Sequence, residues 1–440
     1  MTVKTKAGKY DTCLNYIHHY WKKITYYHPK DKQIHLGMPN RYLAPNNEIF
    51  KFDMFYWDSY FTILGLVKDN KIKLAKGMVD NFVYLFKRFK IIPMRNRYYN
   101  LGTSQIPFLT SMAFEIYNVE PNKNWLAKVL EVAELELKNY WANDTMVEKH
   151  KVYKGLSRYC DHYITHLGAE HESGWDMTSR FHDRCLDYLP VDLNCCLYKY
   201  EMDLYEGFKI LKKYSKAKKY KDLAKQRKKT MTQLMWNDKL KFFFDYNKQK
   251  KQHSHFYSVA GFYPLWAKSA TKQQAELIRK HVLPKLEYEG GVSNTQAEHI
   301  SPDVKQHDHP NGWPHQQYII VKGLLNYGFR EDAERIAKKW VDMNYRLFNE
   351  TGKFWEKYDV VHCRPGVYNP DRYVTQSGFG WTNAIFLRLV KELHLNHPLE
   401  EVVPAHKSNG AVPGKKVVQK KKRPAAKKTS TTARSRQKLT

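Results

Sequence analysis

The 440-residue sequence predicts an all-α domain of helical hairpins joined by long loops, followed by a disordered basic tail. Two observations indicate this fold class. Apolar residues recur at spacings of three and four along most of the chain, which is the period of an amphipathic helix. Runs with a period of two, which are typical of half-buried strands, are scarce and short.

Five segments show the helical period most clearly, and polar or Gly/Pro-rich loops separate them. In chain order they are residues 124–141, 193–211, 316–327, 331–347 and 383–394. In 193–211 the apolar face consists of Leu193, Leu197, Tyr200, Leu204, Phe208 and Leu211. Two brief strands are expected, at 240–246 and 373–376. Long loops within a compact domain usually carry function, so we expect the site to lie on them.

One domain is expected over residues 1–404, because no clean linker interrupts the chain before that point. Residues 405–440 form a different segment. From Lys407 to Thr440 it contains 12 Lys or Arg and no Asp or Glu. Such a segment cannot bury enough apolar surface to offset its ordering entropy, so we expect it to be disordered. It could make non-specific contacts with nucleic acid or another polyanion, or serve only as a solubilising tail.

Cysteine content favours a cytoplasmic protein, and the distribution of charge weakens, without removing, the alternative of a nucleic-acid-binding protein driven by the basic tail. The net charge is +30, but outside the tail it is spread over the chain, so it bears on solubility more than on fold. Six cysteines are few, and none forms a CxxC pair. The N-terminus lacks the apolar core of a signal peptide, and no run of 18 apolar residues could span a membrane. We therefore expect free thiols in the reducing cytoplasm.

Tryptophans recur beside carboxylates, amides or sharp turns in or near the expected loops. The five segments are FYWDSYF (55–61), ESGWDMTSRF (172–181), HDHPNGWP (307–314), FWEKYDV (354–360) and QSGFGWTN (376–383). Aromatic rings offer flat apolar faces and stack on sugars, while carboxylates bind hydroxyls and move protons. A core built of large side chains would explain the aromatic content equally well. The recurrence of five such segments favours a carbohydrate site.

Hydrolysis of a glycosidic bond requires two carboxyl groups. One stays protonated and gives its proton to the leaving oxygen, and the other attacks or activates water. The candidates beside tryptophans are Asp58, Asp176, Asp308 and Glu356. Spacing alone does not choose among them, since a loop aspartate is more often a buried helix cap than a catalyst.

Six blocks resemble the trehalase family, and more broadly the helical-toroid α-glycosidases that include glucosylglycerate and mannosylglycerate hydrolases. In order they are FYWDSYFTILGL (55–66), IPMRNRYYNLGTSQIPF (92–108), ESGWDMTSRF (172–181), QHDHPNGWP (306–314), EKYD (356–359) and GFGWTN (378–383). The resemblance covers residues 40–395, with the blocks in the order of the family. It implies an (α/α)6 toroid, an inverting glycosidase and no cofactor.

The resemblance also assigns roles to individual residues. Asp176, after the Ser-Gly-Trp motif, matches the general acid, and Glu356 matches the general base. Water would attack between Glu356 and the anomeric carbon, on the face opposite Asp176. The positions expected to bind the sugar are Trp57, Asp58, Asn96, Arg97, Gln105, Glu172, Trp175, Asn311, Trp313, Gln376 and Trp381.

Several arginines of the family pattern are replaced. Phe50 or Lys51 stands where an arginine precedes the first Trp-Asp, and Thr103 stands before Ser104–Gln105. Arg372 lies near the place of an expected glutamate, and the Arg-Pro-Glu segment before the acid has no clear equivalent. A guanidinium is a forked donor that other side chains do not replace freely. Arg97, Arg158 or Arg372 could compensate.

Trehalose is consequently the best single expectation for the substrate, and alternatives stay open. Within the enzyme class they are glucosylglycerate, mannosylglycerate or a trimmed oligosaccharide. In another class, the chain could bind carbohydrate without turnover. Histidines crowd two loops, namely His162, His166, His171, His307, His309 and His315. We expect them to contact sugar hydroxyls or solvent, and we expect no metal.

Overall fold

The computed structural model describes residues 7–143, 149–298, 305–366 and 373–397. The chain divides into two units, residues 1–399 and 400–440. The boundary expected at residue 404 and the tail expected from residue 405 lie outside the described residues, so both stay predictions. No helix within the described ranges combines the length and apolar character that crossing a bilayer requires.

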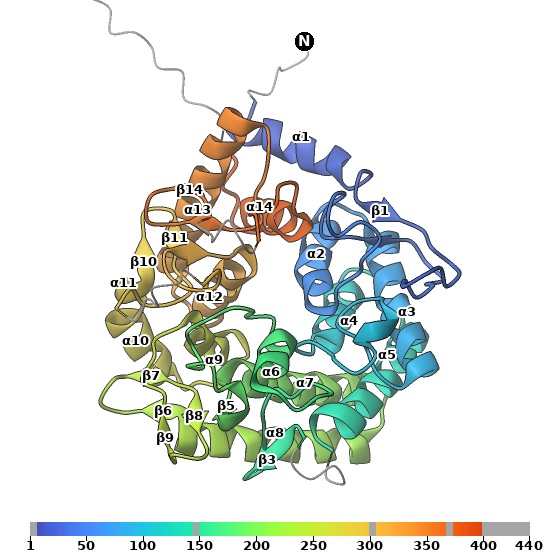
Figure 1. The fold of residues 1–440 in the computed structure, drawn as a ribbon, viewed down its shortest axis with the longest axis vertical. Helices are drawn as coiled ribbons and strands as arrows, with labels where there is room; N and C mark the ends of the chain where they lie inside the picture. Colours follow the sequence, from blue (N-terminus) through green and yellow to red (C-terminus); the bar gives the residue numbers. More distant parts are fainter. Residues whose placement is uncertain (1–6, 144–148, 299–304, 367–372, 398–440) are drawn as a thin grey trace, which may run out of the picture. The chain divides into compact units, whose positions relative to one another are not determined.

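Within the described part of the first unit, six helices form a closed inner ring (Figure 1). They are α2 (Tyr56–Lys68), α4 (Leu109–Tyr117), α7 (Val191–Ile210), α9 (Tyr263–Trp266), α12 (Pro314–Asn326) and α14 (Gly380–Glu392). Each helix packs against the next in this order, and α14 packs against α2. The inner ring therefore closes on itself.

A second layer of helices lies outside this ring (Figure 1). It contains α1 (Asp11–Tyr20), α3 (Ile72–Phe89), α5 (Lys123–Glu136) with η2 (Leu137–Trp141), α8 (Tyr214–Met235), α10 (Lys272–His281) with α11 (Leu283–Leu286), and α13 (Arg330–Thr351). Outer and inner helices alternate along the chain. Each hairpin thus contributes one helix to each layer, and the predicted (α/α)6 toroid is confirmed. All five helical segments expected from the sequence are present.

Side-chain composition separates the two layers. In α2, every residue from Tyr56 to Val67 is buried, and in α14 so is every residue from Gly380 to Val390. A helix that is apolar all round must lie inside. By contrast, α8 buries only 7 of its 22 residues and presents a lysine-rich face to solvent. The pattern of apolar residues therefore decides which helix of each hairpin is the inner one.

Short antiparallel strands and 3-10 turns lie between the helices. The strand pairs are β1 (Thr25–Tyr26) with β2 (Tyr42–Leu43), β3 (Lys151–Tyr153) with β4 (Leu156–Ser157), β6 (Trp236–Asn237) with β7 (Phe242–Phe243), and β10 (Glu287–Tyr288) with β11 (Gly291–Val292). The three-stranded sheets are β5 (Tyr188–Leu189), β8 (Tyr246–Asn247) and β9 (Gln252–His253), and β12 (Asn311–Gly312), β13 (Tyr358–Asp359) and β14 (Arg364–Pro365). The 3-10 turns are η1 (Tyr98–Asn100), η3 (Cys185–Asp187) and η4 (Val259–Phe262).

The two strand predictions fare differently. The segment 240–246 contains β7 and the start of β8, but these belong to separate sheets. The strand expected at 373–376 is wrong. This stretch is extended along the chain before α14, and the Glu356 amide donates to the Gln376 carbonyl at 2.9 Å. It does not build a ladder, and its Tyr373 side chain donates to the Glu356 carboxylate.

One small sheet joins two motif blocks that are far apart in the sequence. In β12 and β13, Asn311 pairs with Asp359 and Gly312 pairs with Tyr358. Trp313 follows directly after β12, and Glu356 lies two residues before β13. The register of this sheet thus sets the position of the HPNGWP block relative to the EKYD block.

Candidate active site

A cavity of about 750 Å³ opens among the loops and the inner-helix ends. Seven of the thirteen residues expected to act on a sugar line it: Trp57, Asp58, Gln105, Asp176, Trp313, Glu356 and Trp381. They come from all six motif blocks. The structure thus brings both expected catalytic residues to one cavity.

Three indole rings of this set come from the N-terminal ends of three inner helices. Trp57 lies in the first turn of α2, Trp313 caps α12, and Trp381 lies in the first turn of α14. The ring centroids of Trp57 and Trp381 are 5.9 Å apart, and those of Trp313 and Trp381 are 5.5 Å apart. Because the inner helices close a ring, their N-terminal aromatics converge. The result is an aromatic floor suited to a sugar face.

Two histidines complete this floor. His307 stacks on Trp313, with centroids 4.1 Å apart and planes only 2° from parallel. His315 lies among the rings and is fully buried. Burial holds the pKa of both histidines well below the usual value, so both are neutral. Within the described residues, no group of three His, Cys, Asp or Glu gathers in a metal-binding arrangement.

Asp176 stands on one wall of the cavity. Its segment follows α6 (His166–Ser173), which begins at the Thr165 cap and ends at Gly174 in the left-handed conformation (φ +72°). A Cβ at Gly174 would come within 2.6 Å of the Trp57 ring. Only glycine fits here, because the backbone must both turn and pass close to the indole. This turn delivers Trp175 to the core and Asp176 to the cavity.

The field around Asp176 favours a protonated acid. Removal from water raises the pKa of Asp176 to about 6, and the Glu356 carboxylate adds to the rise, while His171 and Arg95 oppose it. Burial also raises the pKa of Asp58 well above its ordinary value, with Glu356 and Asp176 as further causes. Three carboxyl groups in one cavity cannot all ionise easily.

Glu356 is held by two donors. Lys357 Nζ lies 2.9 Å from one carboxylate oxygen, and the Tyr373 hydroxyl donates to the other at 2.7 Å. The Lys357 side chain is fully buried, and its ammonium group lies over the Trp313 and Tyr373 rings. Burial and the Glu356 charge raise the pKa of Tyr373, so its hydroxyl remains a donor. These contacts fix the orientation of the Glu356 carboxylate.

Asp308, the fourth candidate acid, has a structural role. It accepts hydrogen bonds from the Thr178 hydroxyl at 2.9 Å and from the Ser179 amide at 3.0 Å. It is buried and does not belong to the cavity lining. These bonds tie the HDHPNGWP block to the segment that follows Asp176. Of the four candidates, the other three line the cavity.

Six expected sugar-binding residues lie outside the cavity lining: Asn96, Arg97, Glu172, Trp175, Asn311 and Gln376. Asn96 accepts from the Met54 amide at 2.7 Å. Glu172 accepts from the Cys160 amide at 2.7 Å and lies 3.0 Å from His150 Nε2. These side chains satisfy buried backbone and ring groups, so they hold the wall from behind.

The other four serve similar ends. Arg97 forms a two-pronged ion pair with Asp53, with two contacts of 2.7 Å. Trp175 is fully buried, and the Arg180 guanidinium lies 4.6 Å above its ring. Asn311 donates to the Gln306 carbonyl at 3.2 Å, and Gln376 donates to the Val374 carbonyl. Motif positions thus divide between the cavity surface and its support.

The positions where the family pattern has arginine can now be located, together with the arginines expected to compensate. Phe50 and Thr103, which stand in their places, both line the cavity. Of the three expected substitutes, Arg372 lies outside the described residues. Arg97 is held by Asp53, and Arg158 donates to the Leu186 carbonyl at 2.9 Å. Neither belongs to the lining.

Arg95 and Tyr373 are among the polar residues of the wall that sequence reasoning missed. Arg95 lies two residues before Arg97 in the same block, and nothing in the sequence ranks one above the other. Tyr373 lay in a segment taken for a strand. Its position just before the closing block could have indicated a role near Glu356.

Fold and cavity together define an (α/α)6 glycosidase architecture with an acidic, tryptophan-lined site. The profile described as Trehalase matches residues 5–167 and 159–394. The chain therefore belongs to the trehalase family. The predicted resemblance is confirmed at this level.

Individual relatives agree with this assignment. The chain is 30% identical to a cytosolic neutral trehalase of Saccharomyces cerevisiae over 80% of this chain and 57% of that protein. It is 28% identical to a trehalase of Tenebrio molitor over 81% of this chain and 72% of that one. The chain thus spans little more than half the length of the yeast relative.

Solved structures give the same picture. A neutral trehalase from Saccharomyces cerevisiae superimposes with a TM-score of 0.71 at 29% identity, over 80% of this chain and 73% of that one. A GH63 mannosylglycerate hydrolase from Thermus thermophilus gives a TM-score of 0.65 at 14% identity, over 86% and 99%. The second likeness concerns the fold alone.

Proposed function

We propose that this chain hydrolyses α,α-trehalose to glucose with inversion, with Asp176 as general acid and Glu356 as general base. The observation that carries the proposal is the pairing of a raised-pKa Asp176 with a doubly hydrogen-bonded Glu356 in one tryptophan-lined cavity. The relatives named trehalase supply the substrate. The description of the yeast relative as cytosolic supports a place in the cytoplasm.

The two carboxyl groups suit opposite tasks. An acid catalyst must hold a proton near neutral pH, and Asp176 with a pKa of about 6 can do so in part. A base must be ionised and free to turn one lone pair toward water. Glu356 accepts from Lys357 and Tyr373 and still has lone pairs available on each oxygen.

The remaining cavity residues would bind the sugar. Trp57, Trp313 and Trp381 offer ring faces, and Gln105 offers an amide that already accepts from the Trp57 backbone at 3.3 Å. Asp58, kept protonated by burial and by its acidic neighbours, would donate to a hydroxyl. No cofactor takes part in this proposal, since inversion requires only two carboxyl groups and water.

Stereochemistry and two substitutions test the proposal. Proton NMR of fresh reaction mixtures should show one β-glucose and one α-glucose per trehalose, since only the attacked ring inverts. Asp176→Asn and Glu356→Gln should each lower kcat by about 10³-fold or more, with Tm unchanged within a few degrees. Two α-glucose products, or full activity in either variant, would overturn the assignment.

A substrate panel separates the alternatives. Glucosylglycerate, mannosylglycerate and kojibiose would be compared with trehalose by the sugar released. Faster turnover of a glycerate glycoside would move the substrate class while leaving the acid and base in place. Binding of trehalose without release of glucose from any substrate would favour a carbohydrate-binding protein. Contact of residues 405–440 with a polyanion stays a separate proposal, tested by nucleic-acid binding with and without them.

A further inference from the structure

The acid wall of the cavity carries an arginine with no assigned task. Arg95 lines the cavity with Tyr99, Asn100 and Thr103. Its side chain is 21% exposed, and the guanidinium lies 5.1 Å from the Phe55 ring centroid. A cation placed against an aromatic face and open to a cavity is well suited to bind a ligand.

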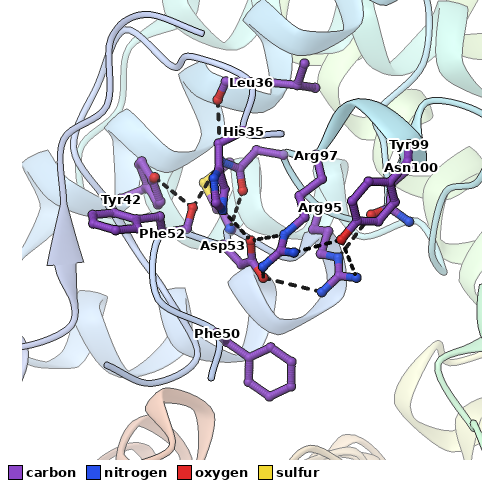
Figure 2. A network of polar contacts seen from close by, with 12 residues as sticks. His35, Leu36, Tyr42, Phe50, Phe52, Asp53, Arg95, Arg97, Tyr99 and Asn100 are labelled. Atoms are coloured by element: carbon purple, nitrogen blue, oxygen red, sulfur yellow. Dashed lines mark hydrogen bonds and ion pairs between the residues drawn. The ribbon is translucent and has the colours of Figure 1, made fainter. Parts of the chain in front are cut away.

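A buried carboxylate fixes Arg95 in place. Asp53, which is fully buried, accepts from Arg95 Nη1 at 3.3 Å and from Arg97 Nε and Nη2 at 2.7 Å. Arg95 Nε also donates to Asn100 at 3.0 Å. Both guanidinium groups reach the Tyr99 hydroxyl, as Figure 2 shows. We call Asp53, Arg95, Arg97 and Tyr99 the Asp53 cluster. Such anchoring orients the guanidinium before any ligand arrives.

The anchoring leaves both donor capacity and charge. Three of the five N–H groups of Arg95 have partners among the described residues, so two remain for a ligand. One carboxylate, Asp53, serves two arginines, and burial lowers the pKa of the nearby His35 so that it adds no charge. The Asp53 cluster therefore keeps one net positive charge beside the cavity.

Arg95 lies on the side of Asp176, where the bond breaks. Its charge acts on the Asp176 carboxyl, as does that of His171. Glu356, by contrast, is held by Lys357 and Tyr373 on its own wall. A general acid protonates the oxygen between the two halves of the substrate. A donor that lines this cavity and acts on the acid is therefore placed to meet the leaving half.

We propose that Arg95 is the specificity-determining residue for the leaving group, a role that rests on the proposed function. Its two available N–H groups donate to a pair of adjacent oxygens on the departing half. Those oxygens are vicinal hydroxyls of a sugar or the two oxygens of a carboxylate, because a planar fork fits either pair.

The test compares substrates that do and do not carry a leaving sugar. Fluoride departs from α-glucosyl fluoride without a sugar on the leaving-group side. Arg95→Gln should lower kcat/KM for trehalose about 10- to 100-fold, which corresponds to losing hydrogen bonds from a charged donor. Hydrolysis of the fluoride should change less than about twofold. Arg95→Lys, which keeps the charge but not the fork, should fall between.

Two control variants distinguish direct binding of the leaving group by Arg95 from an indirect effect through the Asp53 cluster. Arg97→Gln disturbs the Asp53 cluster but not the cavity surface, so it should cause a smaller selective loss on trehalose than Arg95→Gln. Arg88→Gln breaks the surface pair with Asp31, away from the cavity lining, and should change neither. A selective loss in Arg97→Gln equal to that in Arg95→Gln would overturn the proposal. So would unchanged trehalose turnover in Arg95→Gln.

The remaining outcomes show which oxygens Arg95 binds and separate a failure of this proposal from a failure of the proposed function. If Arg95→Gln impairs glucosylglycerate more than trehalose, the bound oxygens belong to a carboxylate, and the reverse order indicates hydroxyls. Failure of the wild-type protein to hydrolyse any of these compounds would refute the proposed function, without bearing on how Arg95 is anchored. Retained fluoride hydrolysis shows that the variant is folded.

Discussion

The two walls of the cavity hold their carboxyl groups in different ways. On the base wall, Glu356 is fixed by direct contacts with Lys357 and Tyr373. On the acid wall, Asp176 is governed by its removal from water and by charges placed around it, His171, Arg95 and Glu356. The base is thus set by hydrogen bonds and the acid by its environment. A point substitution should therefore disturb the base sharply and the acid gradually.

Among substitutions that leave both catalytic carboxyl groups in place, the largest effect should come from removing the buried ammonium of the base wall. Lys357→Met keeps the length of the side chain but leaves the Glu356 carboxylate without its ion-pair partner in a dry site. We expect kcat to fall about 100-fold or more, since unpaired buried charges are costly. Steady-state kinetics with trehalose measure this.

Tyr373→Phe removes the other donor to Glu356 and should lower kcat less than Lys357→Met does. It removes one donor to Glu356 and keeps the ring, so a kcat loss of about tenfold is expected. If Lys357→Met kept wild-type kcat, the base wall would not depend on direct contacts. The contrast between the walls would then be lost.

On the acid wall, the next largest effect should come from a change in the backbone turn at Gly174. Gly174→Ala places a Cβ within 2.6 Å of the Trp57 ring at a positive φ, and Gly352→Ala has nearly the same φ with no atom within 4 Å. Both variants pay the conformational cost of about 1 kcal/mol. Gly174→Ala should lose about 1–3 kcal/mol more and lower activity, because Trp57 or Asp176 must shift. Thermal denaturation of the pair measures the difference, and equal Tm values would show that the contact carries no weight.

The smallest effect expected is a shift of the pH profile. Asp176 acts in its protonated form, so kcat/KM for trehalose should decline as the pH rises through about 6. Arg95 favours the ionised form of Asp176. Its replacement by Gln should therefore move this alkaline limb to higher pH, whereas Lys should leave it in place. A limb that does not move in Arg95→Gln would mean that Arg95 does not act on the acid.

The sequence predicted the helices well because burial imposes a period on each of them. It could not predict ring closure from that period, since α2 and α14 pack together across more than 300 residues; the motif resemblance supplied the toroid. The short α9 carries too few residues to show a period at all.

Within the site, motifs located the blocks better than they located the contacts. Trp57 and Trp381 face the cavity, whereas Asn96 and Glu172, from equally recognisable blocks, bind backbone behind it. The difference is set by side-chain direction in irregular loops, where no period applies. Arg95 and Arg97 show this most plainly, because both grip Asp53 and only one reaches the cavity.

The separation of inner and outer helices keeps the many exposed lysines away from the catalytic carboxyl groups. The lysines of α8 lie in the outer layer, and none of them lines the cavity. Mobile ions screen exposed charges over about 8 Å at physiological ionic strength. Substitutions that change the charge of the surface should therefore leave the electrostatic potential at Asp176 and Glu356 nearly unchanged. In this toroid, exposed charges of the outer helices are therefore screened from the two catalytic carboxyl groups.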